Sequence, residues 1–296
     1  MKVAAILIDT CRELIYRKTL IVYVGLVSLT HLLFVLALQT DVADGVIAGL
    51  TVFGLEGQGS GDSFSLGTGG PGAALDISAA DFVRYVQLVV AFIFYSLGIL
   101  LSVFATASLV PHMLQKGAID LLLSKPMSRS GLFLSRYLGA LAVASANLLY
   151  LVVGLAIILA WKTGIWNGGL VLSGLAMCLY FASLLGFLVL VGTVTRSTTV
   201  SIMIAALLFF VGFIIRFPHQ NTDWPLLITG RVWRALTVGL VEGLYHILPR
   251  TYDMGRVASL LILQEGQVSW GPILNTALVG AGALAVATLY FRRTDF

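Results

Sequence analysis

Residues 109–138 read LVPHMLQKGAIDLLLSKPMSRSGLFLSRYL and lie between two long apolar segments. Residues 115–124 have the pattern of a short amphipathic helix, and Pro126 ends it because proline cannot continue a helix. The stretch is basic, since it carries Lys116, Lys125, Arg129 and Arg136. A basic interval between two apolar segments is typical of a cytoplasmic loop of a membrane protein. We therefore expect the rest of the chain to embed this stretch in a bilayer.

The composition supports a membrane protein and excludes a soluble globule. Hydrophobic residues make up 58% of the 296 residues and charged residues only 11%, and the mean hydropathy is +0.97. Such a chain has too little polar surface to cover a soluble domain. The net charge of +4 does not indicate nucleic acid, because the basic residues cluster at the ends of apolar runs.

The pattern predicts an all-α membrane protein with six transmembrane helices in a domain over residues 20–291. The first apolar run is long enough to be a retained span rather than a cleaved signal. The excess of basic residues on one side places both termini in the cytoplasm. The expected spans cover residues 20–38, 86–110, 138–161, 170–194, 200–215 and 272–291.

Four further segments complete the expected organisation. Residues 1–19 form an amphipathic interfacial helix, either a connector to a cytoplasmic partner or a simple membrane-entry helix. Residues 39–85 form an outer, glycine-rich loop that is flexible, and it lacks the lysine of a phosphate-binding loop. Residues 216–271 hold two short outer helices, either on the membrane or dipping into it. Residues 292–296 form a cytoplasmic tail.

Few side chains within the spans carry chemistry. His31 is either part of a proton path or a hydrogen-bonded packing residue, and the lack of an acidic partner favours packing. Asn147 is similarly favoured as a packing residue. Cys11 and Cys178 are expected in different environments, which argues against a disulfide. The sequence contains no metalloprotease, Walker A or nucleophile-elbow motif, so we expect no enzyme activity in this chain.

The segment KGAIDLLLSKPMSRSGLFLSRYLG, residues 116–139, resembles the coupling region of the ABC-2 type permease family, and in particular of NosY-like permeases. The shared pattern is a glycine, a small residue, an acidic residue, a Leu-Leu-Leu-Ser run, a proline and then Ser-Arg. RELIYRKT, residues 12–19, is similar to the interfacial helix of that family. Ala118 departs from the threonine of the family pattern, and Met113 and Gln115 stand where an acidic residue is common.

This resemblance implies a coupling helix within residues 111–136 that docks on an ATPase. The implied contact residues are Lys116, Gly117, Asp120, Leu121, Leu122, Leu123, Ser124, Pro126 and Arg129, with Arg12, Glu13 and Arg17 in the interfacial helix. The resemblance also implies two ABC ATPase subunits, which bind ATP and Mg²⁺, and a second permease copy in a homodimer or pseudo-dimer. This chain itself is expected to bind no cofactor or metal.

The residues of the coupling segment are consistent with this role on physical grounds. Leu121 to Leu123 supply an apolar patch, while Lys116 and Asp120 are four residues apart and can pair on the other side. An ordinary anchored loop would explain the basic residues but not a helix with a proline stop.

The resulting expectation is a permease subunit in the cytoplasmic membrane of a prokaryote, which couples ATP hydrolysis to export of a hydrophobic or polymeric substrate. An alternative is a NosY-like role, in which the outer segments contact an extracytoplasmic partner in metal-site assembly or surface function. A non-transport scaffold or an intramembrane enzyme are further alternatives.

Overall fold

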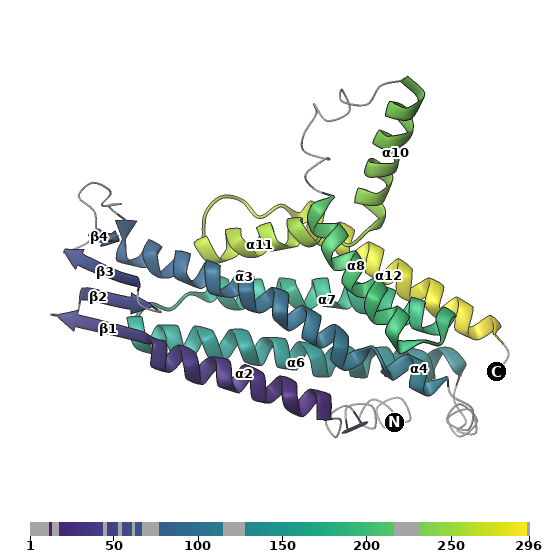
Figure 1. Cartoon of the computed structure of the whole chain (residues 1–296), viewed down its shortest axis with the longest axis horizontal. Coiled ribbons are helices and arrows are strands. Elements are labelled where there is room, and N and C mark those ends of the chain that lie inside the picture. Colours follow the sequence, from purple (N-terminus) through teal and green to yellow (C-terminus); the bar gives the residue numbers. More distant parts are fainter. Residues whose placement is uncertain are drawn as a thin grey trace.

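Long apolar helices form most of the computed structural model, which describes residues 12–13, 18–43, 46–52, 55–60, 63–66, 77–114, 128–215 and 231–294. Figure 1 shows α2, α3, α6 and α7 lying along the long axis of the molecule, and neighbouring helices among them are in contact. The helices are α2 (Lys18–Ala37), α3 (Ala79–Thr106), α4 (Leu109–Met113), α6 (Arg129–Thr163), α7 (Gly168–Thr195), α8 (Thr198–Ile214), α10 (Arg231–Ile247), α11 (Thr251–Leu263) and α12 (Trp270–Arg293).

Four apolar helical runs in the described residues are long enough to cross a membrane: Val83–Met113, Arg129–Thr163, Gly168–Thr195 and Trp270–Arg293. Two further expected spans correspond to shorter apolar helices, Ile21–Leu36 and Thr198–Ile214. At 1.5 Å per residue, a 17-residue helix such as α8 covers about 26 Å, slightly less than a bilayer core of about 30 Å. A helical membrane protein is thus confirmed, and the number of six spans stays a prediction.

Helix ends differ from the expected spans because polar capping residues set them. The third expected span begins at Arg129 rather than near residue 138, since the Ser128 hydroxyl accepts a hydrogen bond from the Gly131 backbone N–H at 3.2 Å. Residues 129–136 of the expected coupling region are therefore helical. At the other end, α12 continues through Arg293, so the first two residues of the expected tail belong to the helix.

The segment expected to be a flexible loop, residues 39–85, contains a five-stranded antiparallel sheet, which corrects that prediction and adds strands to the all-α expectation. Strands β1 (Leu38–Ala43), β2 (Val46–Val52), β3 (Leu55–Ser60), β4 (Ser63–Leu66) and β5 (Ile77–Ser78) pair in chain order. The β1–β2 register shifts between Asp41 and Val42. Glycine-rich composition indicated a linker, but connections of two residues let β1 to β4 satisfy their backbone hydrogen bonds with each other. The sheet lies at one end of the helical bundle (Figure 1).

Helix α7 lies at the centre of the bundle and contacts α3, α6, α8, α11 and α12. Small residues allow the backbones of α7 and α12 to approach closely. A Cβ on Gly280 would lie 2.5 Å from the Ser183 Cα, and one on Gly186 would lie 2.7 Å from the Gly280 carbonyl oxygen. Small residues at helix crossings are typical of membrane proteins, where dispersion contacts replace the hydrophobic effect. Tyr180 and Phe181 are buried around this centre.

The two short helices expected between residues 216 and 271 are present as α10 and α11. Helix α11 packs against α7, α3 and α8, whereas Figure 1 shows α10 standing away from the bundle. Pro249 lies between the two helices, and its carbonyl oxygen accepts from the Thr251 backbone N–H at 3.0 Å. A membrane-lying position for both helices was one expectation, and the packing of α11 among the long helices favours the alternative that it enters the bilayer.

Candidate functional site

Most residues of the predicted coupling site lie outside the described part of the chain. These are Arg17, Lys116, Gly117, Asp120, Leu121, Leu122, Leu123, Ser124 and Pro126. Arg12, Glu13 and Arg129 are described, as are both flanks of the segment. The structural account of this site therefore rests on the described residues on either side of 115–127.

Buried apolar packing anchors both flanks at the end of the bundle away from the sheet (Figure 1). On the first flank, Leu109, Met113 and Leu114 are buried in one cluster with Phe133 at the start of α6. On the other, Phe133 stacks on Phe291 of α12, with ring centroids 5.0 Å apart. The described residues on both sides of 115–127 are therefore packed tightly against the helices, in interiors that have few voids.

The first turns of α6 also contact the N-terminal segment and the end of α12. The Arg136 guanidinium pairs with the Glu13 carboxylate, and the side chains are 9% and 38% exposed, respectively. The Arg136 Nε is buried without a hydrogen-bond partner in the described residues. Arg129 donates to the backbone carbonyl of Thr294 at 3.1 Å. Two of the predicted contact residues therefore lie at the start of α6. Arg129 is its first residue, and Glu13 pairs with Arg136 two turns later.

A polar cluster at the sheet end centres on Asn167 in the turn between α6 and α7. Its side-chain N–H₂ donates to Gln87 Oε1 at 2.5 Å and to the Ile262 carbonyl at 2.8 Å. Its side-chain oxygen accepts from the Gly169 backbone at 3.0 Å and from Gln264 Nε2 at 3.0 Å. Asn167 is buried, and its amide makes four hydrogen bonds that join α3, α7 and α11.

The cluster continues to the first turns of α3. Arg84 donates to Gln264 Oε1 at 3.0 Å and pairs with Asp81 at 3.1 Å. The end of α11 is therefore tied to the start of α3 and to the α6–α7 turn. Residues 162–169, between two expected spans, were assigned no role from the sequence, although an asparagine just before a helix is a favoured N-cap residue.

The beginning of α11 is held by a second set of bonds at Thr251. The Thr251 hydroxyl donates to the Phe209 carbonyl at 3.0 Å, so the Tyr180 hydroxyl, 2.5 Å away, donates to Thr251. Gly212 of α8 permits this approach, because a Cβ there would lie 2.5 Å from the Pro249 carbonyl oxygen. Both ends of α11 are thus fixed by buried polar contacts.

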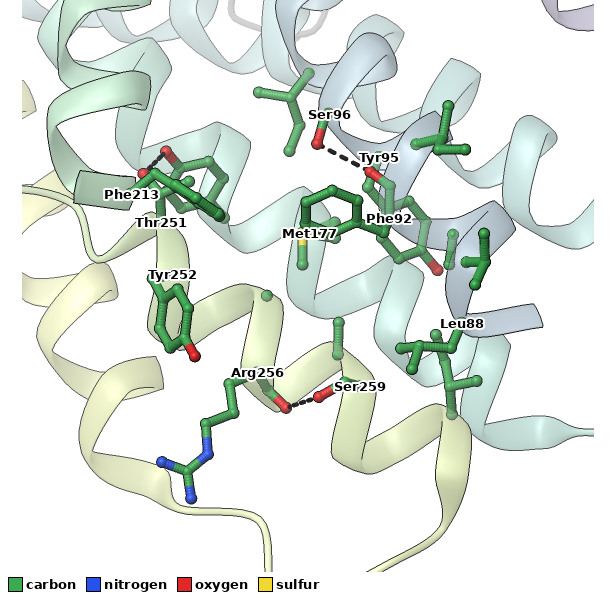
Figure 2. Close-up of a pocket in the computed structure, with 18 of the residues that line it drawn as sticks. Leu88, Phe92, Tyr95, Ser96, Met177, Phe213, Thr251, Tyr252, Arg256 and Ser259 are labelled. Carbon is green, nitrogen blue, oxygen red and sulfur yellow. Dashed lines mark hydrogen bonds between the residues drawn. The ribbon is translucent and has the colours of Figure 1, made fainter. Parts of the chain in front are cut away.

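A cavity of about 610 Å³ lies between α3, α7, α8 and α11. Apolar side chains form most of its wall, including Phe92, Met177 and Phe213, as Figure 2 shows. Its volume falls within the roughly 300–1,000 Å³ of typical ligand pockets. Arg256 of α11 also lines it. The sequence did not indicate this site, since α11 was expected only as one of two short outer helices.

The interior polar side chains singled out from sequence are located as follows. His31 is buried, its Nε2 donates to the Leu151 carbonyl at 3.0 Å, and its ring meets Tyr150 edge-on. This hydrogen bond between α2 and α6 is what a packing role requires, and the choice between packing and a proton path stays a prediction. Asn147 is buried in α6, and its side-chain nitrogen has no partner in the described residues, so its role stays a prediction. Cys178 lies in α7 with a free thiol, and Cys11 lies outside the described residues.

The apolar helices define a multi-pass membrane protein. A family model described as "ABC-2 family transporter protein" matches residues 114–218, which include the coupling segment and the helices that follow it. The match covers 105 of the 296 residues and confirms the resemblance to the ABC-2 type permease family noted in the sequence. It does not separate NosY-like members from others. No curated protein shows significant similarity to the chain.

Proposed function

We propose that the chain is the membrane-spanning permease subunit of an ABC-2 type transporter, which couples ATP hydrolysis in two separate ATPase subunits to export. The observation that carries this proposal is the family match, because residues 114–218 include the predicted coupling segment. The ATPases bind ATP and Mg²⁺, and a second permease copy completes the complex.

The positions of basic residues support six spans with both termini in the cytoplasm of a prokaryote. Arg129 begins α6, Arg196 caps the end of α7 and Arg293 ends α12. These three helix ends lie together, opposite the sheet (Figure 1). Basic residues favour the cytoplasmic side of membrane proteins, so the sheet would face outward.

In the proposed mechanism, closure of the ATPases displaces the coupling helix within residues 111–136. The displacement passes to α4 and α6 through the buried cluster around Phe133. The Arg136–Glu13 ion pair carries the N-terminal interfacial helix along with α6. The end of α12 follows through Arg129 and the stacked Phe291.

Co-purification of the tagged full chain with its ATPase tests this coupling. Asp120→Lys and Leu122→Glu are expected to abolish ATPase recovery, because they reverse a charge and insert one into the docking face. Glu265→Lys is the matched control, since Glu265 is exposed in the turn after α11, at the opposite end. Normal ATPase recovery with both coupling variants would overturn the proposal and favour a scaffold.

The sheet favours one alternative, a NosY-like permease that passes ATPase motion to an extracytoplasmic partner. Strands β1–β5 form a folded element at the end of the bundle that is proposed to face outward, where a partner of that kind would bind. Replacing residues 38–78 with a short flexible linker would then abolish partner recovery while ATPase recovery persists. Loss of neither would exclude the sheet as the docking element.

A further inference from the structure

The cavity between α3, α7, α8 and α11 offers almost no hydrogen-bonding capacity to a ligand. Apart from Tyr252, which is partly exposed at its edge, its hydroxyl-bearing residues donate their hydroxyl groups within the protein. Ser96 donates to the Phe92 carbonyl at 2.9 Å, and Ser259 to the Arg256 carbonyl at 2.8 Å. The Thr251 hydroxyl is likewise used by Phe209. A polar solute would lose its water there without replacement, so the wall suits a hydrocarbon chain.

The same is true of Tyr95 on the inner wall. Ser173 donates to the Leu170 carbonyl at 2.7 Å, so the Tyr95 hydroxyl, 2.6 Å from Ser173 Oγ, donates to that serine. The innermost part of the cavity is therefore also closed to polar groups.

The cavity opens sideways from the bundle, at the level of the long helices. Several of its lining residues on α3 and α8 are exposed on the molecular surface, namely Val89, Phe92, Ile93 and Phe213. A lateral opening among apolar side chains faces the acyl chains of a bilayer. Access from the surrounding lipid therefore needs no passage through a polar region.

Arg256 is the one charged residue among those that line the cavity in the described part of the chain. Its side chain is exposed, and Figure 2 shows it reaching away from the apolar wall beside Tyr252. The ion pairs found among the described residues do not include it. Arg256 lies eight residues before Gln264, which bonds Arg84 near the sheet, so it sits about 12 Å along the helix from that end. A guanidinium at such a depth is costly unless an anion or water accompanies it.

We infer that this cavity binds an anionic membrane lipid, with an acyl chain between α3 and α11 and the phosphate paired to Arg256. The apolar wall and the single cation at the mouth match the two halves of such a molecule. Binding needs only the chain in a bilayer, whereas a role of this lipid as cargo rests on the proposed transport function.

Photo-crosslinking of the full chain in lipid nanodiscs tests the inference. The probes are a phosphatidylglycerol and a phosphatidylcholine that carry the same diazirine-labelled acyl chain, and labelled peptides are mapped by mass spectrometry. We expect phosphatidylglycerol to label peptides of α3 and α11 about fivefold more than phosphatidylcholine does, because only the anionic lipid can pair with Arg256 without a competing headgroup cation.

Two variants separate the head-group contact from the chain site. Arg256→Gln should lower phosphatidylglycerol labelling to the phosphatidylcholine level, and Arg256→Lys should retain most of it. Gly255→Leu should block labelling by both lipids, since a Cβ at Gly255 meets no atom within 4 Å and the added side chain enters open space. Gly239→Leu on α10 is the matched control, because a Cβ there also meets no atom within 4 Å.

Equal labelling by both lipids, or unchanged preference in Arg256→Gln, would overturn the inference. A second outcome would also overturn it: two copies that carry Gly255→Cys form a disulfide with each other, and the chain shows no lipid labelling. A second copy of the chain would then cover the opening. The assay contains no ATPase. Lipid labelling can therefore succeed or fail independently of the proposed ATPase coupling.

Discussion

Gly169 and Gly280 mark places where helix backbones come together without an intervening side chain. A Cβ on Gly280 would meet the Ser183 backbone of α7, and one on Gly169 would collide with the Leu261 carbonyl of α11. Neither neighbour is the flexible end of a side chain, so neither can move aside alone. Close backbone contacts of this kind are where a single methyl group has the largest effect.

Gly169→Ala is expected to destabilise the protein by about 1–3 kcal/mol, because α11 must shift away from α7 to admit the methyl group. Thermal unfolding of the detergent-solubilised chain measures this loss. Gly168→Ala is the control one position earlier, where a Cβ would meet only Trp166 Nε1 at 3.8 Å. Equal melting temperatures for the two variants would contradict the close approach.

The Arg136–Glu13 ion pair is a second feature that a single substitution can test. Glu13→Gln leaves the nearly buried guanidinium without its carboxylate, and we expect a loss of about 1–2 kcal/mol, reduced from the cost at a fully buried pair by the exposure of Glu13. Arg12→Gln is the control, since Arg12 is the exposed neighbour.

The exchange of both charges, Glu13→Arg with Arg136→Glu, should recover part of the stability lost in Glu13→Gln. The matching single variants are Glu13→Arg and Arg136→Glu. A loss of stability in the double variant that exceeds the sum of their two losses would argue against a direct pair.

At the scale of elements, α11 is a short helix whose position depends on contacts at its two ends. The Tyr180–Thr251 bond holds its beginning, and the Asn167 cluster holds its end against α3 and α7. Between these ends it forms one wall of the cavity. The cavity therefore keeps its shape only while both ends stay attached.

Asn167→Ala is expected to destabilise the protein by about 2 kcal/mol or more, because it removes a helix cap and leaves buried partners unsatisfied. Hydrogen exchange should increase mainly in α11 and the start of α7. Asn275→Ala is the control, since the Asn275 side chain makes one longer bond of 3.3 Å to the His246 carbonyl. Exchange that rises uniformly over all helices would contradict a local attachment.

At the scale of the whole molecule, the sheet and the basic helix ends lie at opposite ends of the bundle (Figure 1). The sheet, the α6–α7 turn and the end of α11 share one end. The starts of α2 and α6 and the end of α12 lie toward the other. This polarity gives the proposed orientation a direct test.

Single cysteines in a Cys11→Ser, Cys178→Ser background should report the two sides of the membrane. Ser65→Cys in β4 and Glu265→Cys after α11 are expected to react with a membrane-impermeant maleimide in intact cells. Thr294→Cys after α12 should react only after permeabilisation, because basic helix ends stay on the cytoplasmic side. Labelling of Thr294→Cys in intact cells would reverse the orientation.

Local patterns account for much of what the sequence predicted correctly. The long apolar runs predicted the helices, since a span must satisfy its backbone hydrogen bonds internally. The two short helices expected within residues 216–271 are present as α10 and α11. Residues 116–139 pointed to the ABC-2 family before the family match. The strands between Leu38 and Ser78 were missed because glycine-rich composition outweighed their weak alternation.

The sequence by itself determined the membrane class, the approximate helices and the family resemblance, because hydropathy, proline breaks and the coupling motif are properties of neighbouring residues. Only the tertiary structure decided the sheet, the Asn167 cluster and the cavity. Asn167 and Gln87 are 80 residues apart, and Arg84 and Gln264 are 180 apart. Contacts at such separations arise from how helices pack, and no local period encodes that packing.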